Sequence, residues 1–373
     1  MALNEYGVWE YTCPGAGPCG GYNIEDWLCL LDDMAAHGMN SLALVIKWAT
    51  TGYKSALPWL DQDPSCKAIS SNNRILLMVL AEAKKRNILV WLVVVCSYHQ
   101  VKEFGWVPPN GQTTGAFSYD PDYPGMPDRM VRLFREIAEI FGAAHGIIAE
   151  MESVEFDWPY RVPLYNAWAV RNGRKSYEAL RQLPMDARAY RIHDWRDYLT
   201  ERRCSVLKDI EVSLRAAGFG GKLAMICETC NEEGSYHQVL NLKRYRETMP
   251  GWGAVFYEYH RNINRWSGAD FGIAQPKELG LETYYLGRGV MTYDSHLLTI
   301  PLEENWRRDL EDVVRFGANG FWFFGADAGG GDCHCSLKTL QSWGYSDGLE
   351  ARRRMFELGM NMLNKKTARN TLT

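Results

Sequence analysis

The feature that most constrains the fold is a repeated alternation of two hydrophobic periods along the chain. Short runs rich in β-branched and aromatic residues, such as 41–48 (SLALVIKW) and 88–99 (ILVWLVVVCSYH), are typical of buried strands. Between them, apolar residues recur at helical spacing, as in a segment that begins at the capping residue Asn23 and ends at His37-Gly38. This alternation occurs eight times, and no linker or internal repeat divides it.

The alternation predicts eight strand–helix units. The predicted strands are 6–11, 41–48, 88–99, one within 146–158, 222–228, 253–260, 289–296 and 320–324. The predicted helices are 23–37, 73–86, 128–143, 186–217, 242–248, 276–286, 302–316 and 348–365. Eight such units favour a closed (β/α)8 TIM barrel over a doubly wound sheet, and 373 residues fit the roughly 250 to more than 400 residues of such barrels. We expect residues 1–373 to form one domain.

The lengths of the connections indicate which end of the barrel carries the site. Connections from helix to strand are short, as at Asn87, whereas those from strand to helix are long: 100–127, 159–185 and 325–345. We therefore expect long inserted loops after strands 3, 4 and 8. In this fold the loops that follow the strands form the active-site face.

Carboxylates, histidines and tryptophans cluster at the predicted strand ends. They are Trp9, Glu10, Lys47, Trp48, His99, Glu155, Asp157, Glu228, Glu258, His260, Asp294, His296, Trp322 and Asp327, with Glu152 just before the fourth end. A single acid at a strand end is usually a solvated cap or an ion-pair partner. Because like charges raise each other's pKa, so many acids at one rim are better explained as a functional site.

Strand alternation narrows the choice among these acids. Glu228 shares a strand face with Ala224 and Ile226, which suit a barrel interior. In the predicted seventh strand, Asp294 shares its face with Val290 and Thr292. In the fourth, Glu155 and Asp157 share one face, while Glu150 and Glu152 fall out of phase with them, so that strand is either bulged or begins later.

Several chemistries can be compared with this set. The first strand, YGVWEY, lacks the His-x-His of metal-dependent amidohydrolases, and acids in the Gly-rich segment after strand 8 would repel phosphate. Lys47 alone is a weak candidate for Schiff-base chemistry. A metal-dependent sugar isomerase or epimerase could use Glu228, Glu258, Asp294 and His260. Two carboxylates with aromatic platforms fit glycoside hydrolysis, and 14 Trp, 20 Tyr and 13 Phe fit either sugar platforms or a large core.

Three segments resemble those of known enzymes. Residues 84–92 (KKRNILVWL) are similar to the approach to strand three in alpha-amylase-like and fucosidase-like barrels, 154–158 (VEFDW) to strand four of retaining families, and 320–324 (GFWFF) to the last strand of many glycosidases. The chain thus resembles glycoside hydrolases that use a (β/α)8 barrel. It departs from the alpha-amylase pattern at Glu155 and Tyr293, and from the chitinase pattern at Pro159.

The resemblance implies a retaining two-carboxylate mechanism without a metal or other cofactor. Asp157 would attack the anomeric carbon, Glu228 would act as acid/base and Asp294 would orient sugar hydroxyls. Trp322 would floor a sugar subsite, and Glu152, Glu155 and Glu258 are reserves for the acids. The remaining strand-end residues would bind substrate. A non-catalytic carbohydrate-binding barrel and the metal-dependent isomerase remain open alternatives.

Charge and hydropathy bear on partners and location. The 41 basic and 45 acidic residues are spread along the chain without a basic stripe, so we expect no nucleic-acid partner. No apolar run approaches the roughly 20 residues of a membrane span. No signal peptide is visible, which fits a cytoplasmic protein or a secreted one whose leader has been removed. Cys227 and Cys230 have zinc-like spacing, but no second pair follows them.

Overall fold

The computed structural model describes most of the chain as one closed barrel. The described residues are 3–11, 22–47, 69–95, 122, 125–151, 161–182, 188–228, 241–257, 274–287, 302–324, 341, 344, 346 and 348–370. Within them, eight parallel strands follow one another in sequence order, and β1 pairs with β8 to close the ring. The predicted (β/α)8 TIM barrel is confirmed.

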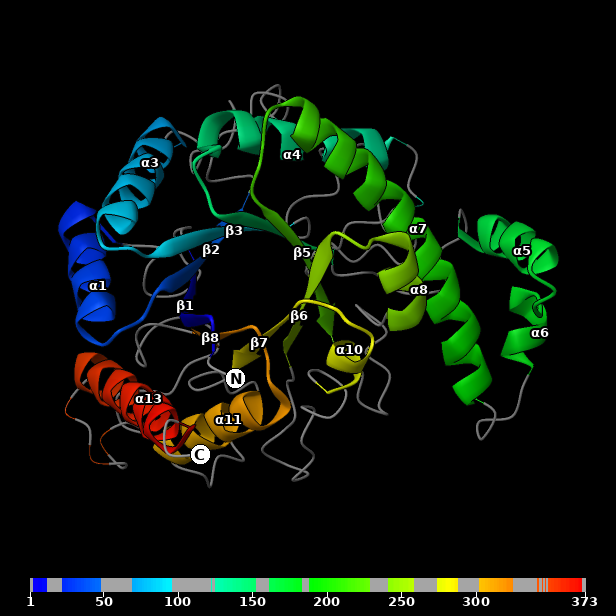
Figure 1. Ribbon diagram of the computed structural model, residues 1–373. Coiled ribbons are helices and arrows are strands. Elements are labelled where there is room, and N and C mark those ends of the chain that lie inside the picture. The colour runs from blue at the N-terminus through cyan, green and yellow to red at the C-terminus, as the bar shows by residue number, and fades with distance from the viewer. Residues whose placement is uncertain are drawn as a thin grey trace.

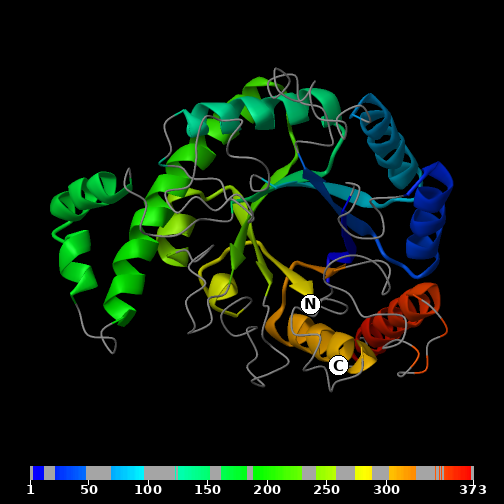
Figure 2. The ribbon, with the colours of Figure 1, turned by 180° about the vertical axis from the view of Figure 1, so that it is seen from behind.

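The strands surround a common axis, and most helices form a ring outside them (Figure 1). The strands are β1 (Glu5–Tyr11), β2 (Ser41–Lys47), β3 (Leu89–Val95), β4 (Gly146–Glu150), β5 (Lys222–Glu228), β6 (Trp252–Tyr257), β7 (Thr283–Gly287) and β8 (Gly320–Phe324). The described helices are α1 (Ile24–Ala36), α3 (Ile69–Lys85), α4 (Met126–Phe141), α5 (Arg161–Arg171), α6 (Tyr177–Arg181), α7 (Arg188–Ala216), α8 (Leu242–Thr248), α10 (Gln275–Glu278), α11 (Leu302–Phe316) and α13 (Gly348–Asn370). Helices α5 and α6 lie outside this ring, on the far side of α7, and the view from behind shows the same arrangement (Figure 2).

Local signals explain several boundaries that the sequence predicts. Helix α1 begins with a capping box, in which the Asn23 side chain accepts from the Asp26 amide and the Asp26 carboxylate accepts from the Asn23 amide, both at 3.0 Å. After α3, Asn87 takes a left-handed φ of 58°, and this tight turn returns the chain directly to β3. Helices α8 and α11 and strand β8 have the predicted bounds.

The predicted seventh strand is wrong. Strand β7 is Thr283–Gly287 rather than 289–296, and the predicted helix 276–286 shrinks to α10. Gly280 has a positive φ of 72°, which ends the helix, and the run after it is buried at every position. Asp294 and His296 therefore follow β7 at a distance and lie outside the described residues.

Strand β4 and the segment that follows it also differ from the expectation. Strand β4 ends at Glu150, so it neither bulges nor begins late, and Glu155 and Asp157 lie beyond it. The predicted loop 159–185 contains helices α5 and α6. We call these two helices, residues 161–181, the α5–α6 insertion. Its aromatic residues form a small core of their own against α7.

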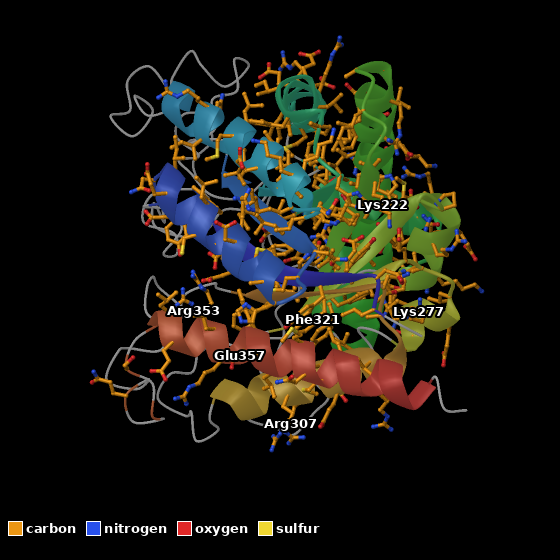
Figure 3. All side chains as sticks on the ribbon, turned by 60° about the vertical axis from the view of Figure 1, so that its left-hand side comes forward. Lys222, Lys277, Arg307, Phe321, Arg353 and Glu357 are labelled. Carbon is orange, nitrogen blue, oxygen red and sulfur yellow. The ribbon has the colours of Figure 1, made fainter. Side chains whose placement is uncertain are left out.

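Alternating strand residues form two hydrophobic layers. On β3, Trp91 and Val93 point into the barrel, whereas Val90 and Leu92 pack against the helices. Large rings fill the interior, and glycine makes room for them: a Cβ on Gly146 would lie 2.5 Å from the Trp91 ring. Outside the barrel, Phe321 is buried beneath α13, the helix that carries the exposed Arg353 and Glu357 (Figure 3).

Candidate functional site

Two acidic residues end adjacent strands at what we call the C-terminal mouth, the end of the barrel where all the parallel strands finish. Glu150 is the last residue of β4 and Glu228 the last residue of β5, and these strands pair with each other. Each acid lies two residues after a side chain of the barrel interior, Ile148 and Ile226 respectively. Strand alternation therefore gives both positions the inward register.

Most of the sequence-predicted site residues lie outside the described part of the chain. These are Trp48, His99, Glu152, Glu155, Asp157, Glu258, His260, Asp294, His296 and Asp327. Lys47 and Glu228 are placed by their backbone, each as the last residue of its strand. Lys47 follows the interior residue Val45 by two positions, so it shares the inward register. Trp9, Glu10 and Trp322 are described with their side chains.

Trp9 lies inside the barrel on β1 and is 2% exposed. Its ring centroid is 6.0 Å from that of Trp322. The buried Trp9 Nε1 has no hydrogen-bond partner among the described residues. A buried donor without an acceptor is uncommon in proteins and requires an explanation, such as an ordered water molecule or a ligand.

The position of Trp322 corrects the expectation that its ring floors a sugar subsite. The side chain is fully buried and stacks on Tyr284, with ring centroids 5.0 Å apart and planes 16° apart. Its Nε1 donates to Oγ of Ser41, the first residue of β2, at 2.9 Å. The indole therefore reaches toward the N-terminal end of the barrel, because Ser41 begins its strand there. This is the environment of a core tryptophan.

Glu10 occupies the opposite face of β1 from Trp9. Tyr6 and Val8, which share its parity, belong to the layer between the barrel and the helices. Glu10 is fully buried. Its side chain thus departs from the barrel axis, and the structure does not bring it together with the inward-register positions at the mouth.

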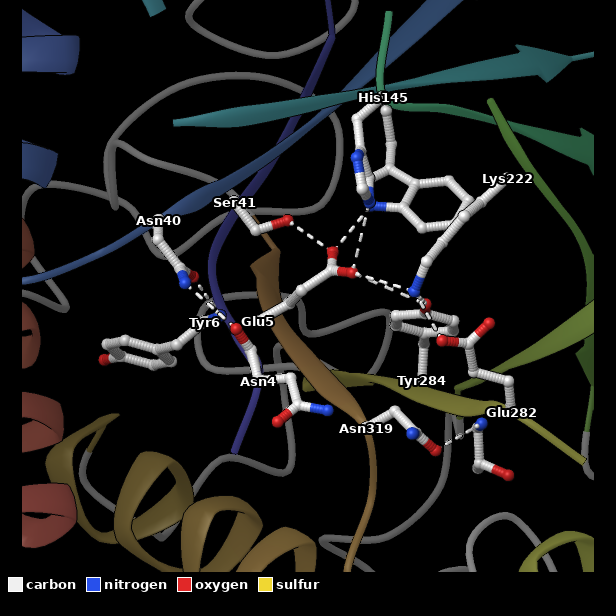
Figure 4. Close-up of polar contacts among 12 residues, drawn as sticks. Asn4, Glu5, Tyr6, Asn40, Ser41, His145, Lys222, Glu282, Tyr284 and Asn319 are labelled. Carbon is white, nitrogen blue, oxygen red and sulfur yellow. Dashed lines mark hydrogen bonds and ion pairs between the residues drawn. The ribbon is translucent and has the colours of Figure 1, made fainter. Parts of the chain in front are cut away.

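A polar network at the N-terminal end of the barrel was missed by sequence reasoning (Figure 4). Its centre is the buried Glu5 carboxylate, which accepts from Trp91 Nε1 at 2.6 Å and from Ser41 Oγ at 3.1 Å. His145 Nε2 lies 3.5 Å and Lys222 Nζ 3.7 Å from the same carboxylate. In this fold, residues at the N-terminal end usually serve stability rather than catalysis. Glu5 precedes the predicted strand 6–11 by one position, so the sequence pattern did not place it in the barrel.

The network shifts the ionisation of its members. Burial by itself raises the pKa of the Glu5 carboxyl, but the hydrogen bond from Trp91 and the neighbouring His145 and Lys222 outweigh it and lower that pKa below its ordinary value. Burial raises the pKa of the Tyr284 hydroxyl, and the nearby Glu5 and Glu282 carboxylates raise it further. Glu5 is therefore held as an anion and Tyr284 as a neutral phenol.

Cys227 does not have the surroundings of a metal-binding thiolate. Its side chain is buried in the layer between the barrel and the helices, and burial raises the pKa of its thiol. Cys230 lies outside the described residues. Across the described ranges, no group of three His, Cys, Asp or Glu side chains is arranged to hold a metal ion. No helix of the described chain is long and apolar enough to cross a membrane.

Comparisons with known proteins identify the fold. No protein-family model and no curated protein matches the chain. Among solved structures it is similar to the endo-beta-1,4-mannanase from Thermotoga petrophila, with a TM-score of 0.58 and 12% identity over 98% of this chain and 78% of that one. It is also similar to a GH138 enzyme targeting pectin rhamnogalacturonan II, with a TM-score of 0.56 and 13% identity. That match covers 98% of this chain but only 40% of the pectin-targeting enzyme.

A sugar epimerase has a similar fold. D-psicose 3-epimerase from Clostridium cellulolyticum H10 matches with a TM-score of 0.50 and 11% identity, over 96% of this chain and 99% of that one. At such identities the likeness is one of fold. The barrel is thus shared with glycoside hydrolases and with a D-psicose 3-epimerase, so the fold alone does not distinguish the two activities, and the site residues have to be considered.

Proposed function

We propose that the chain is a glycoside hydrolase that cleaves an O-glycosidic bond in an oligosaccharide, polysaccharide or glycoconjugate at the C-terminal mouth. One observation carries the proposal: Glu150 and Glu228 end the paired strands β4 and β5 in the inward register. Glycoside hydrolysis requires two carboxylates on either side of the scissile bond. The fold likeness to a mannanase and to a GH138 enzyme supports the same activity.

The proposed mechanism is retaining. Glu228 protonates the leaving oxygen and then activates water, while a carboxylate from the segment that includes the end of β4 attacks the anomeric carbon. The family resemblance favours Asp157 as this nucleophile, and the end of β4 at Glu150 makes that residue the second candidate. Retention requires the two carboxylates to be about 5–5.5 Å apart, which residues of adjacent strands can achieve.

Other proposed roles concern the sugar. Asp294 orients hydroxyl groups, and the Trp9 indole N–H, which has no acceptor among the described residues, donates to a substrate hydroxyl directly or through water. The proposed substrate-binding residues are Trp9, Lys47, Trp48, His99, Glu152, Glu155, Glu258, His260, His296 and Asp327. We do not include Trp322, which is buried in the core and points toward the N-terminal end, or Glu10, whose side chain points away from the barrel axis.

A panel of nitrophenyl glycosides tests the proposal. We expect turnover of at least one substrate by the wild-type protein and slower steady-state turnover in Glu228→Gln, because the second step then lacks the base that activates water. The control is Glu282→Gln, which changes an acid at the opposite end of the barrel, where Glu282 Oε1 lies 2.5 Å from Lys222 Nζ. Saccharide binding without turnover would instead identify a non-catalytic carbohydrate-binding barrel.

A metal-dependent sugar isomerase or epimerase is the second candidate, because the chain shares the fold of D-psicose 3-epimerase. Glu228, Glu258, Asp294 and His260 would supply hard oxygen ligands and one imidazole for a divalent cation. EDTA separates the two candidates. A glycosidase of the proposed kind keeps its activity in EDTA, whereas conversion of a free ketose that EDTA abolishes and Mn²⁺ restores would establish the epimerase.

A further inference from the structure

The chain leaving β4 is held by a buried arginine of α7. The Arg203 side chain is fully buried, and its Nη2 donates to the Met151 carbonyl at 2.7 Å. Met151 directly follows Glu150, the last residue of β4. A charged donor to a buried carbonyl is a strong and directional bond, so Arg203 fixes the backbone beside this acid.

The chain entering α5 is held by a buried carboxylate. Asp122 accepts from Tyr198 Oη at 2.6 Å and from Arg202 Nε at 2.7 Å, both on α7. Arg161, the first residue of α5, places its Nε 3.4 Å from the same carboxylate, and neither of these two side chains is exposed. The Arg161 guanidinium also lies over the Trp195 ring, 5.1 Å from its centroid.

Together these contacts hold both ends of one connection. Tyr198, Arg202 and Arg203 lie within two turns of α7. Through them, α7 contacts Met151 directly and Arg161 by way of Asp122. Between those two residues lies segment 152–160, which includes the candidate acids Glu152, Glu155 and Asp157. We call Asp122, Tyr198, Arg202 and Arg203 the α7 anchor.

The α7 anchor is not needed merely to attach the α5–α6 insertion to α7. Its aromatic core already packs Tyr165 and Trp168 against Trp195 on α7, and Arg174 Nη1 forms an ion pair with Asp194 at 3.3 Å. Burying further charges costs desolvation energy that an apolar contact would avoid. Charged hydrogen bonds fix position and direction more tightly than apolar packing does, and a catalytic carboxylate needs that precision.

We propose that the α7 anchor residues are positioning residues for the acids at the end of β4 and in the connection to α5. The proposal rests on the proposed glycosidase function for its kinetic consequences only. The anchor itself can be tested without any activity, so the two can fail separately.

The first test compares two identical substitutions. Tyr198→Phe removes the hydroxyl that donates to Asp122, whereas Tyr165→Phe removes a hydroxyl that donates to the Lys175 carbonyl at 3.3 Å. Both rings belong to the same aromatic cluster and are 1% exposed, with centroids 5.4 Å apart. We expect faster amide hydrogen exchange in peptides spanning 146–161 for Tyr198→Phe, and wild-type exchange there for Tyr165→Phe.

The second test uses arginines of one helix. Arg203→Gln removes the charged donor to Met151, and Arg203→Lys keeps a charge. The control is Arg215→Gln, because Arg215 also donates to carbonyls, those of Phe219 and Gly221, but at the end of α7 that leads into β5. We expect kcat to fall about 10- to 100-fold in Arg203→Gln with KM nearly unchanged, partial recovery in Arg203→Lys, and no change in Arg215→Gln.

Equal exchange and equal kcat in Tyr198→Phe and Tyr165→Phe, together with wild-type kcat in Arg203→Gln, would overturn the proposal. Altered exchange in 146–161 in a protein without glycosidase activity would retain the anchor and reject the proposed function. Exchange that rises over the whole barrel in Tyr198→Phe would assign Asp122 to global stability and also overturn the proposal.

Discussion

Trp9 and Trp322 are neighbours inside the barrel, with ring centroids 6.0 Å apart, yet their indole N–H groups differ in hydrogen bonding. Trp322 Nε1 donates to Ser41 Oγ at 2.9 Å, whereas the buried Trp9 Nε1 has no acceptor within the described part of the chain. The Trp322 ring is therefore fixed as part of the core, whereas the Trp9 N–H remains available for the proposed hydrogen bond to substrate.

Replacing each tryptophan by phenylalanine should separate these roles. Trp322→Phe loses a buried hydrogen bond, so we expect its free energy of unfolding to fall by about 1 kcal/mol more than that of Trp9→Phe. Urea denaturation measures this difference. In steady-state kinetics, Trp9→Phe should raise KM several-fold, while Trp322→Phe should leave it unchanged. Equal stabilities and equal KM values would mean that the Trp9 N–H has no ligand.

Glu5 should make the free energy of unfolding depend on pH in the acidic range. Its carboxyl has a pKa below the ordinary value of 4.5, since contacts with Trp91, His145 and Lys222 outweigh the effect of burial. A group whose pKa is depressed by folding stabilises the protein above its unfolded pKa, and this contribution is lost as the pH falls through the folded pKa. We expect the free energy of unfolding to drop more steeply below about pH 4.5 in the wild type than in Glu5→Gln.

The matched control is Glu82→Gln. Glu82 also has a lowered carboxyl pKa, caused by hydrogen bonds from Lys85 and Arg86, but it lies on the surface of α3. We expect its pH profile of stability to follow the wild type closely. A Glu5→Gln profile parallel to that of the wild type would show that the Glu5 network does not govern acid unfolding.

Glu228→Gln should lose activity selectively. If Glu228 is the acid/base, glycosides with very acidic leaving groups need no proton from it and should be cleaved at the first step almost as fast as by the wild type. Azide should then accelerate turnover and yield a glycosyl azide of retained configuration, because it attacks the covalent intermediate. Uniform loss over all leaving groups without azide rescue would remove Glu228 from this role.

The nucleophile can be identified by comparing Asp157→Ala with Glu150→Ala. The nucleophile variant should lose nearly all turnover and be partly restored by azide with inverted configuration, since azide replaces the missing carboxylate. We expect this behaviour from Asp157→Ala. Rescue in Glu150→Ala instead would assign the role to the residue that ends β4. Product configuration is read by NMR.

The sequence predicted the barrel because eight amphipathic units repeat its signal, but single units carried less information. The predicted helix 276–286 ran through Gly280, but Gly280 ends α10 and the next strand is β7. Short apolar runs fit a strand and a buried helix equally well. The prediction that Glu228 shares a strand face with the barrel interior rested on Ala224 and Ile226, and both do line the barrel. The argument for Asp294 depended on a strand placed too late.

Contacts between residues far apart in sequence were beyond such reasoning. Nothing near Asp122 indicates that it meets Arg161 and Arg202, because the pattern of a buried ion pair has no local signature. The same holds for Glu5, which meets His145 and Lys222 only when the barrel closes. Trp322 was expected to line a sugar subsite, but its position on β8 does not determine toward which end of the barrel its ring points.

The interior of the barrel is packed with large side chains toward its N-terminal end. Trp91, Tyr284 and Trp322 fill the N-terminal half and are fully buried, and the hydrogen-bond network around Glu5 closes the N-terminal end. In the proposed glycosidase, substrate and both products would therefore have to enter and leave at the C-terminal mouth. A product that lingers there occupies the route of the next substrate, so we expect competitive inhibition by product and progress curves that slow well before the substrate is exhausted.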